Sequence, residues 1–307
     1  MSVPCAKVIV NPAAGGYSIH RQWPQINRQL RDTGLQFDYE YTEGEGHGIQ
    51  LAKAAVDNGY RYLIAVGGDG TVNEVANGIL CSTDSSSTIL GIVSAGTACS
   101  FARSVDIPLD YASACSLLTG QGRLLIDVGV VEYRNGDQSL QRFFVNEATA
   151  GFSAAMIEAS KRLPRHSTPA VNYAHRVVVA LRSLLSYQNK HVTLHVENVV
   201  EDICIWAIAM VNGRYLGGGM YIAPHARLDD SLLDMVLFGD IGRLELLRIW
   251  PTLYRGDHIT HPQIRVKKVT SVTIQASEQI PVEVDGEILG ECPASFSMMP
   301  SALTVVV

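Results

Sequence analysis

The sequence lacks most of the short motifs by which enzymes are recognised. No Gly-Lys dipeptide occurs among its 307 residues and no GxGxxG follows a predicted strand, so a P-loop and a dinucleotide-binding fingerprint are both absent. The six cysteines form no CxxC pair and the nine histidines show no HExxH spacing, so neither a zinc site nor a disulfide framework is indicated. The stretch from Gly151 to Ala155 lacks the second glycine of a nucleophile elbow. Any phosphate binding must therefore use another design.

Basic charge and long apolar runs are also scarce. The chain has 24 Lys and Arg against 30 Asp and Glu, and its net charge of −6 argues against general binding of nucleic acid. The longest strongly apolar run, 203 to 211, is far shorter than the roughly 20 residues that span a bilayer. No signal-peptide pattern opens the chain. We therefore expect a protein of the reducing cytoplasm that at most lies on a membrane surface.

One stretch of the sequence combines a buried strand, a glycine-rich turn and the start of a helix. The apolar run Tyr62 to Val66 is typical of a strand buried on both faces of a parallel sheet. It is followed by Gly-Gly-Asp-Gly-Thr at 67–71, and then by apolar residues at helical spacing. Glycines before a helix N-terminus favour an anion such as phosphate. An acid inside such a loop would repel phosphate unless a cation intervened, so Asp69 suggests Mg²⁺. The predicted helix has Val72, Val75, Ala76 and Ile79 on its buried stripe and Asn73, Glu74 and Asn77 outside it.

The order of strand and helix signals predicts two domains. Residues 7–128 alternate between them, which is typical of a parallel sheet wrapped by helices in a three-layer α/β domain. Several of its strands end in polar, glycine-containing loops, which we expect to meet at one edge of the sheet. Residues 129–291 consist mainly of short alternating segments with turns at 135–136, 212–213 and 285–286, which favour an antiparallel β-sandwich. Pattern alone does not assign the closing strand, Ala302 to Val307, to either domain.

Five motifs occur in an order that resembles the diacylglycerol kinase catalytic-domain family, the bacterial lipid kinases related to sphingosine kinases. Gly-Gly-Asp-Gly-Thr alone is less specific, because NAD kinases and phosphofructokinases share it. The motifs are Asn11-Pro12 with Gly15-Gly16, Gly67-Gly68-Asp69-Gly70-Thr71 with Asn73-Glu74, Gly96-Thr97 with Phe101-Ala102-Arg103, Asp127-Val128-Gly129, and Asp285-Gly286-Glu287.

The resemblance implies an ATP- and Mg²⁺-dependent lipid kinase with its site between the two domains, the strands of about 292–307 returning to complete the first. It implies a general base at Glu287, with Asp285 the next candidate, although a plain hairpin turn also explains these residues. It further implies a structural Mg²⁺ held by the Asp230 carboxylate and by the carbonyls of Arg227 and Leu232. The residues expected at the nucleotide are Asn11, Thr42, Gly67, Gly68, Asp69, Gly70, Thr71, Val72, Asn73, Glu74, Gly96 and Thr97.

Two departures from the family pattern bear on catalysis. Cys99-Ser100 stands where the family usually has Asn-Asp, which removes a carboxylate from an acidic network that includes Asp69 and Asp127. Ser231 replaces a glycine that commonly follows the loop aspartate. Two other functions therefore stay open: a soluble-substrate kinase of the NAD-kinase kind, and a nucleotide- or lipid-binding regulator that has lost catalysis.

A basic segment could bring the protein to its lipid substrate. No acid occurs between Glu158 and Glu197, and a helix expected at about 170–187 has a wide apolar side. This pattern suits docking on anionic headgroups, but it equally suits a helix packed on the sandwich with a solvated basic face. The sequence leaves the oligomeric state open, a homodimer included, and does not identify the lipid. The basic residues are Lys161, Arg162, Arg165, Arg176, Arg182 and Lys190.

Overall fold

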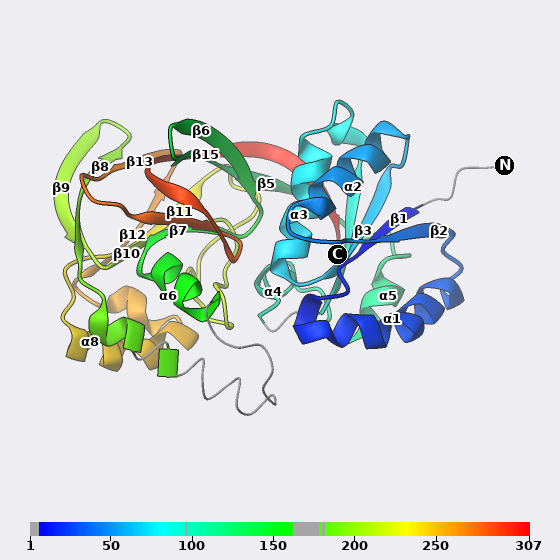
Figure 1. The fold of residues 1–307 in the computed structure, drawn as a ribbon, viewed down its shortest axis with the longest axis horizontal. Coiled ribbons are helices and arrows are strands. Elements are labelled where there is room, and N and C mark those ends of the chain that lie inside the picture. Colours follow the sequence, from blue (N-terminus) through cyan, green and yellow to red (C-terminus); the bar gives the residue numbers. More distant parts are fainter. Residues whose placement is uncertain (1–5, 96–97, 162–177, 180–181) are drawn as a thin grey trace.

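The computed structural model describes residues 6–95, 98–161, 178–179 and 182–307, which form two lobes (Figure 1). Gly96 and Thr97, two of the residues expected at the nucleotide, lie outside the described residues. So does most of the basic segment, 162–177 and 180–181. In the described part of the chain, no helix combines the length and the apolar character needed to cross a membrane.

The N-terminal lobe is a parallel sheet between two layers of helices, as the alternating pattern predicts. Strands β1 (Ala6–Val10), β2 (Phe37–Tyr41), β3 (Tyr62–Gly67) and β4 (Ile89–Ser94) pair in the order β4-β3-β1-β2. Helices α1 (Ala14–Asp32) and α5 (Tyr111–Leu117) contribute to one buried cluster against the sheet, whereas α2 (His47–Asp57) and α3 (Asp69–Leu80) contribute to another. A 3-10 turn, η1 (Ser85–Ser87), precedes β4, and the short helix α4 (Ser100–Ser104) follows it.

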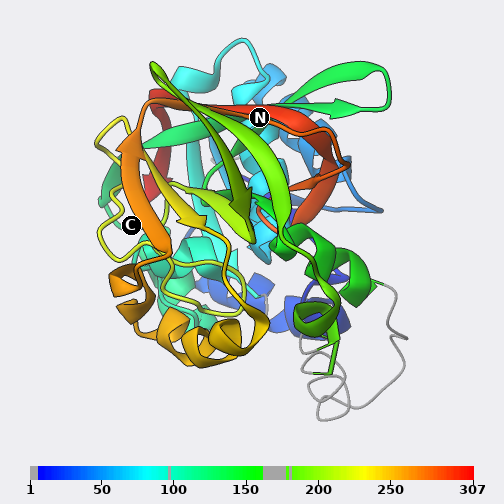
Figure 2. The ribbon, with the colours of Figure 1, turned by 90° about the vertical axis from the view of Figure 1, so that its left-hand side faces the viewer.

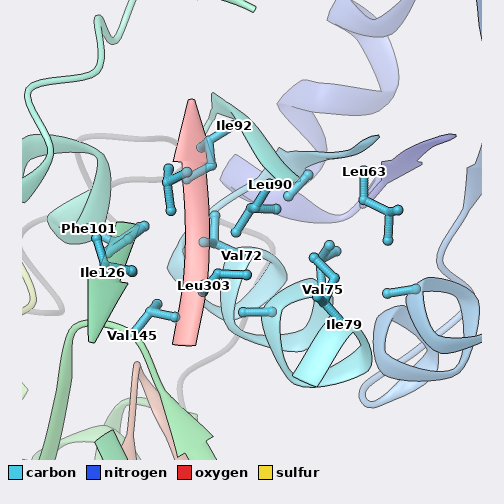
Figure 3. Close-up of a cluster of buried hydrophobic side chains, with 14 of the residues drawn as sticks. Leu63, Val72, Val75, Ile79, Leu90, Ile92, Phe101, Ile126, Val145 and Leu303 are labelled. Atoms are coloured by element: carbon cyan, nitrogen blue, oxygen red, sulfur yellow. The ribbon is translucent and has the colours of Figure 1, made fainter. Parts of the chain in front are cut away.

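Helix α3 packs through the apolar stripe expected from the sequence. Val72, Val75 and Ile79 are buried together with Leu63 and Leu90 of the neighbouring strands (Figure 3). The same cluster includes Leu303 near the end of the chain and Val145 from the second lobe. The core that holds the glycine-rich turn is therefore built from three distant parts of the sequence.

Two long strands run between the lobes. Strand β5 (Arg123–Asn135) pairs antiparallel with β15 (Glu287–Val306), and the end of β15 also pairs in parallel with β4 through Thr304 and Ile89. The short strand expected at the end of the chain is thus the last part of a 20-residue strand. The expected boundary near residue 128 falls inside β5, so the chain passes between the lobes within a strand.

The C-terminal lobe is rich in antiparallel strands. One layer has the order β12-β11-β10-β7-β14, and the other contains β15 with β13, β8, β9, β5 and β6. A core that includes Ile208, Val282 and Phe296 draws on strands of both layers, as a sandwich requires. Figures 1 and 2 show the strands of this lobe from two directions. Helices α6 (Phe152–Lys161) and α8 (Arg243–Ile249), with η2 (Trp250–Tyr254) and η3 (Asp257–Thr260), complete the lobe. The strands are β6 (Gln138–Phe144), β7 (Glu147–Gly151), β8 (Lys190–Val196), β9 (Val199–Ile205), β10 (Ala207–Val211), β11 (Leu233–Phe238), β12 (Ile264–Val269), β13 (Ser271–Gln275) and β14 (Pro281–Val284).

Two segments of this lobe are each divided between two strands, and one expected turn is not a hairpin. The apolar run 203–211 is divided at Trp206 between β9 and β10, because the Trp206 N–H turns to the carbonyls of Phe238 and Gly239. The segment 263–274 likewise divides at Thr270 into β12 and β13. Asn212-Gly213 is not a hairpin turn, since β10 is followed by the long loop 212–232 before β11.

Candidate active site

The glycine-rich turn connects β3 to α3. Two of its positions need glycine because a Cβ would come too close to neighbouring side chains, and not because of the backbone conformation. Gly67, Gly68 and Gly70 all have negative φ, so none of them adopts the left-handed conformation that favours glycine. A Cβ at Gly67 would lie 2.3 Å from Oγ1 of Thr71, and one at Gly70 would lie 3.3 Å from Oε1 of Glu287. The backbone therefore lies close to other groups here, and α3 begins at Asp69 with its first N–H groups directed at the turn.

Asn11 joins the first loop to this turn. Its Nδ2 donates to Oγ1 of Thr71 at 3.0 Å, and its Oδ1 accepts from the Ala13 N–H at 3.0 Å. The N–H of Asn11 donates to Val66 O at the end of β3. The loops after β1 and β3 thus meet at the carboxyl edge of the sheet, as their sequence positions predict.

Glu74 connects α3 to the third loop of this edge. Its carboxylate accepts from the N–H groups of Gly46 at 2.7 Å and Gly48 at 2.8 Å, at the start of α2. A carboxylate at this place stabilises the positive end of the α2 dipole. Thr42 is buried in the same region, and its N–H donates to Val10 O. Glu74 therefore orders the loop that begins at Thr42. Direct contact of either residue with nucleotide stays a prediction.

The side of α3 that lies outside its apolar stripe is buried against the second lobe. Asn73 and Asn77 are 1% and 2% exposed. Both side-chain amides donate to the carbonyl of Phe143 in β6, at 2.8 and 2.9 Å, and Oδ1 of Asn77 accepts from the Phe143 N–H. Asn73 also donates to Oδ2 of Asp285 at 2.7 Å. These amides join the two lobes, so Asn73 is already engaged within the protein. Val72 is likewise a core residue, 2% exposed.

Asp285 is a buried acceptor for backbone groups. It is 2% exposed, at the turn between β14 and β15, with φ of 44° followed by Gly286 at 92°. Its Oδ1 accepts from the N–H groups of Asn146 and Glu147, and its Oδ2 from Val145. Burial nevertheless raises its pKa to about 6, against these hydrogen bonds, which lower it. A carboxylate held by so many donors is poorly placed to approach a substrate hydroxyl.

Glu287 is the more accessible of the two candidate bases. Its side chain is 18% exposed, and its Oε1 lies beside Gly70 at the start of α3. Its Oε2 accepts from Nη2 of Arg142 at 3.1 Å. The turn therefore buries Asp285 and presents Glu287 next to the glycine-rich loop. The hairpin-turn interpretation of Asp285-Gly286-Glu287 is confirmed, whereas the role of Glu287 as general base stays a prediction.

Two further buried acids lie beside this turn, and the sequence interpretation missed them. Glu147 and Glu283 are 5% and 2% exposed, on neighbouring strands. Burial and the charge of Asp285 raise the pKa of Glu147 well above its ordinary value. Burial raises that of Glu283 to about 7, although Thr149 and the Gly286 N–H donate to it. The signal that could have found them is an acid next to the apolar residues of a short strand, as at Glu283 between Val282 and Val284. The name acidic centre is used below for Asp69, Glu147, Glu283, Asp285 and Glu287.

Asp69 is held by the short helix that follows β4. Its Oδ1 accepts from the N–H of Phe101 at 3.0 Å, and burial raises its pKa. Ser100, which stands in place of the usual aspartate, is 1% exposed, and its hydroxyl has no hydrogen-bond partner in the described part of the chain. Residues 99–101 therefore still position Asp69 through the backbone, although position 100 supplies no charge.

Asp127 accepts hydrogen bonds from two turns outside the glycine-rich loop. Its Oδ2 accepts from the Ser231 N–H at 2.6 Å and its Oδ1 from the Ser301 N–H at 2.7 Å. Both serines have positive φ, 62° and 46°, a conformation that costs energy for residues other than glycine. Asp127 thus stabilises the strained turn that Ser231 occupies in place of glycine.

The expected magnesium loop already contains a counter-cation. Oδ1 of Asp230 accepts from the Leu232 N–H, and Oδ2 accepts from Nζ of Lys268, which also donates to Asp234. Arg227 lies in the same loop and pairs through its guanidinium with Asp229. Each oxygen of Asp230 thus accepts one hydrogen bond in this arrangement. The Mg²⁺ ligand set of Asp230, Arg227 and Leu232 stays a prediction, and no function is derived from a metal there.

The comparisons with known proteins cover both lobes. The diacylglycerol kinase catalytic domain model matches residues 5–131, and the YegS C-terminal NAD kinase beta sandwich-like domain model matches residues 146–307. A diacylglycerol kinase of Staphylococcus carnosus is 28% identical over 95% of this chain and 91% of its own length. One of Staphylococcus haemolyticus is also 28% identical, over 95% of this chain and 84% of its own length.

Solved structures show the same fold. A Bacillus anthracis chain matches with a TM-score of 0.79 at 22% identity, covering 100% of this chain and 96% of its own. A yeast NADH kinase complexed with NADH matches with a TM-score of 0.54 at 8% identity, covering 99% of this chain and 83% of its own. The two matched models account for the two lobes and follow the order of the sequence motifs. The chain therefore belongs to the diacylglycerol kinase catalytic-domain family of lipid kinases.

Proposed function

We propose that this protein transfers the γ-phosphate of ATP to the hydroxyl of a diacylglycerol-like lipid. The observation that carries the proposal is the position of Glu287, whose Oε1 lies beside Gly70 of the glycine-rich turn. A phosphate bound by the first N–H groups of α3 would lie next to this carboxylate. The names of the two curated relatives above, both diacylglycerol kinases, favour the lipid class.

In the proposed reaction Glu287 accepts the proton of the lipid hydroxyl as its oxygen attacks the γ-phosphorus. A new O–P bond forms, and the bond from the γ-phosphorus to the bridging oxygen breaks to leave ADP. The turn at 67–71 and the start of α3 hold the phosphates, while Asn11 and Glu74 fix the loops beside them. Asp285 holds the turn between β14 and β15 against the start of β7, so that Glu287 stays next to the glycine-rich turn.

The acidic centre fits a requirement for Mg²⁺ bound with the nucleotide. Asp69 lies among carboxyl groups whose charges act on one another, and burial leaves these charges poorly screened by water. Asp69 would hold Mg²⁺ directly or through water, and the bound ion would neutralise charge on the phosphates. Among the described residues no group of three or more His, Cys, Asp or Glu is arranged to bind a metal on its own. The nucleotide phosphates would therefore complete such a site.

The decisive test is a kinase assay with radiolabelled ATP, Mg²⁺ and a panel of acceptors. The panel contains diacylglycerol, ceramide and a sphingoid base in mixed micelles, with NAD as a soluble acceptor. We expect label in a lipid product and none in NAD. Label in NAD alone would instead favour the NAD-kinase alternative, for which the fold likeness to NADH kinase is the supporting observation. Folded protein that labels no acceptor would contradict the proposal and favour a binding protein.

A further inference from the structure

Arg142 connects the two sides of the candidate site. It lies on β6 and is paired across the hairpin with Val131 of β5. Its Nη2 donates to Oε2 of Glu287 at 3.1 Å, and its Nε donates to Oδ1 of Asn73 at 3.2 Å. One guanidinium thus contacts the candidate base in the second lobe and the helix that follows the glycine-rich turn in the first.

The position of Arg142 is fixed from both sides. The next residue, Phe143, is bound to α3 through its N–H and its carbonyl, by Asn77 and Asn73. The side chains of Arg142 and Glu287 are only 15% and 18% exposed. Guanidinium is planar and presents its donors in a rigid fork, so two acceptors at fixed positions determine its orientation. Arg142 therefore restricts where the Glu287 carboxylate can lie.

The charge of Arg142 also matters for the chemistry. A base must be ionised to accept a proton, and Glu287 lies on the same hairpin as Glu283 and Asp285. Like charges nearby favour protonation, whereas an adjacent cation favours the carboxylate. Asp69 of α3 and Glu147 of β7 add further negative charge to the same centre. Arg142 supplies a cation to this centre through its ion pair with Glu287.

We propose that Arg142 is a positioning residue that holds Glu287 ionised and directed at the glycine-rich turn. This inference rests on the proposed function, because it assigns Glu287 the role of base. A purely structural role, in which Arg142 only ties β6 to α3, would affect stability without changing the protonation of Glu287.

The test compares Arg142→Gln and Arg142→Lys with a control, Arg134→Gln, which removes an exposed arginine from the same β5–β6 hairpin. In Arg142→Gln we expect kcat to fall by about 10- to 100-fold, because the base is no longer held in a reactive geometry. The KM for ATP should change little, and the acidic limb of the kcat profile should move up by about one pH unit. Arg142→Lys should restore the limb and part of kcat, and Arg134→Gln should resemble the wild type.

A direct titration separates failure of this inference from failure of the proposed function. Carbon-13 NMR of labelled glutamate carboxyls, with Glu287 assigned from Glu287→Gln, reports its pKa in the folded protein without any lipid. A higher Glu287 pKa in Arg142→Gln than in the wild type supports the inference even if no acceptor lipid is found. An unchanged Glu287 pKa together with wild-type kcat in Arg142→Gln would overturn it. If Arg142→Gln does not fold, Arg142→Lys is compared with the wild type instead. A wild-type Glu287 pKa with part of kcat retained supports the inference, because lysine keeps the charge but not the planar fork. A raised Glu287 pKa despite the retained charge overturns it.

Discussion

Two acidic regions of the protein differ in how the charge of their buried carboxylates is compensated. Asp230, in the loop before β11, and Asp234, on β11, share the ammonium of Lys268. In the acidic centre, Glu147, Glu283 and Asp285 are buried side by side on β7, β14 and the turn after β14. Backbone N–H groups and hydroxyls supply their hydrogen bonds, and the pKa values of all three are raised.

The difference separates a structural use of acids from a functional one. A buried carboxylate paired with a lysine has its charge compensated within the protein. Carboxylates that meet only neutral donors keep a negative potential, which a bound cation or a proton can relieve. The acidic centre therefore has an uncompensated negative potential next to the glycine-rich turn, where the proposed nucleotide and Mg²⁺ would bind.

The largest effect is expected from Glu287→Gln. Removing a general base should lower kcat by about 10²- to 10⁴-fold, whereas the melting temperature should hardly change because this side chain is partly exposed. The measurement is lipid phosphorylation at saturating ATP, together with a thermal melt. Near-normal turnover in this variant would remove Glu287 from the mechanism.

Asp285→Asn should show the opposite balance, with stability as the main loss. The carboxylate now accepts hydrogen bonds from backbone N–H groups, and an amide NH₂ in its place would face donors with a donor. The lost hydrogen bonds should lower the free energy of unfolding by about 2–3 kcal/mol. Chemical denaturation of this variant beside Glu287→Gln measures the contrast. Full stability with turnover abolished would instead make Asp285 the reacting acid.

Glu283→Gln should change how the stability of the protein depends on pH, because it removes a buried carboxylate whose pKa is raised. The pKa of Glu283 is raised from 4.5 to about 7, so its contribution to stability is fully present below about pH 4.5 and is lost as the pH rises through 7. Glutamine does not titrate and can still serve Thr149 and the Gly286 N–H. Relative to wild type, the variant should therefore gain stability between pH 5 and pH 8, by up to about 3 kcal/mol.

Denaturation at several pH values measures this gain, with the exposed Glu132→Gln as the control. A stability difference between Glu283→Gln and wild type that does not change with pH would show that burial does not raise the pKa of Glu283.

Lys268→Met should give the smallest effect and tests the acidic loop. Asp234 is 3% exposed and would lose its cation, which should cost about 1–3 kcal/mol of stability. Mg²⁺ should recover part of this loss by binding the freed carboxylates, while shifting the wild-type melting temperature less. The neighbouring Lys267→Met, which removes an exposed pair with Glu197, is the control. Equal Mg²⁺ effects in all three proteins would contradict a counter-cation role for Lys268.

Much of the fold followed from local patterns. The central strand, the stripe of Val72, Val75 and Ile79, and the hairpin turn at 285–286 were predicted from periodicity and turn chemistry, and the structure contains each of them. The site was harder to predict. Asn73 and Asn77 lie outside the apolar stripe of α3 in the sequence, yet they are buried because β6 supplies partners for their amides. Arg142 carried no local signal at all.

The sequence by itself determined the elements, the order of the motifs and the presence of an acid in a glycine-rich turn. These depend on residues close together in the chain, where periodicity and glycine content have direct consequences. Only the tertiary structure showed that Asp285 is buried among backbone donors while Glu287 is more exposed, brought Arg142 to Glu287 and paired Lys268 with Asp230. Each of these depends on a contact across tens of residues or more, and burial and charge compensation are decided by such contacts rather than by local sequence.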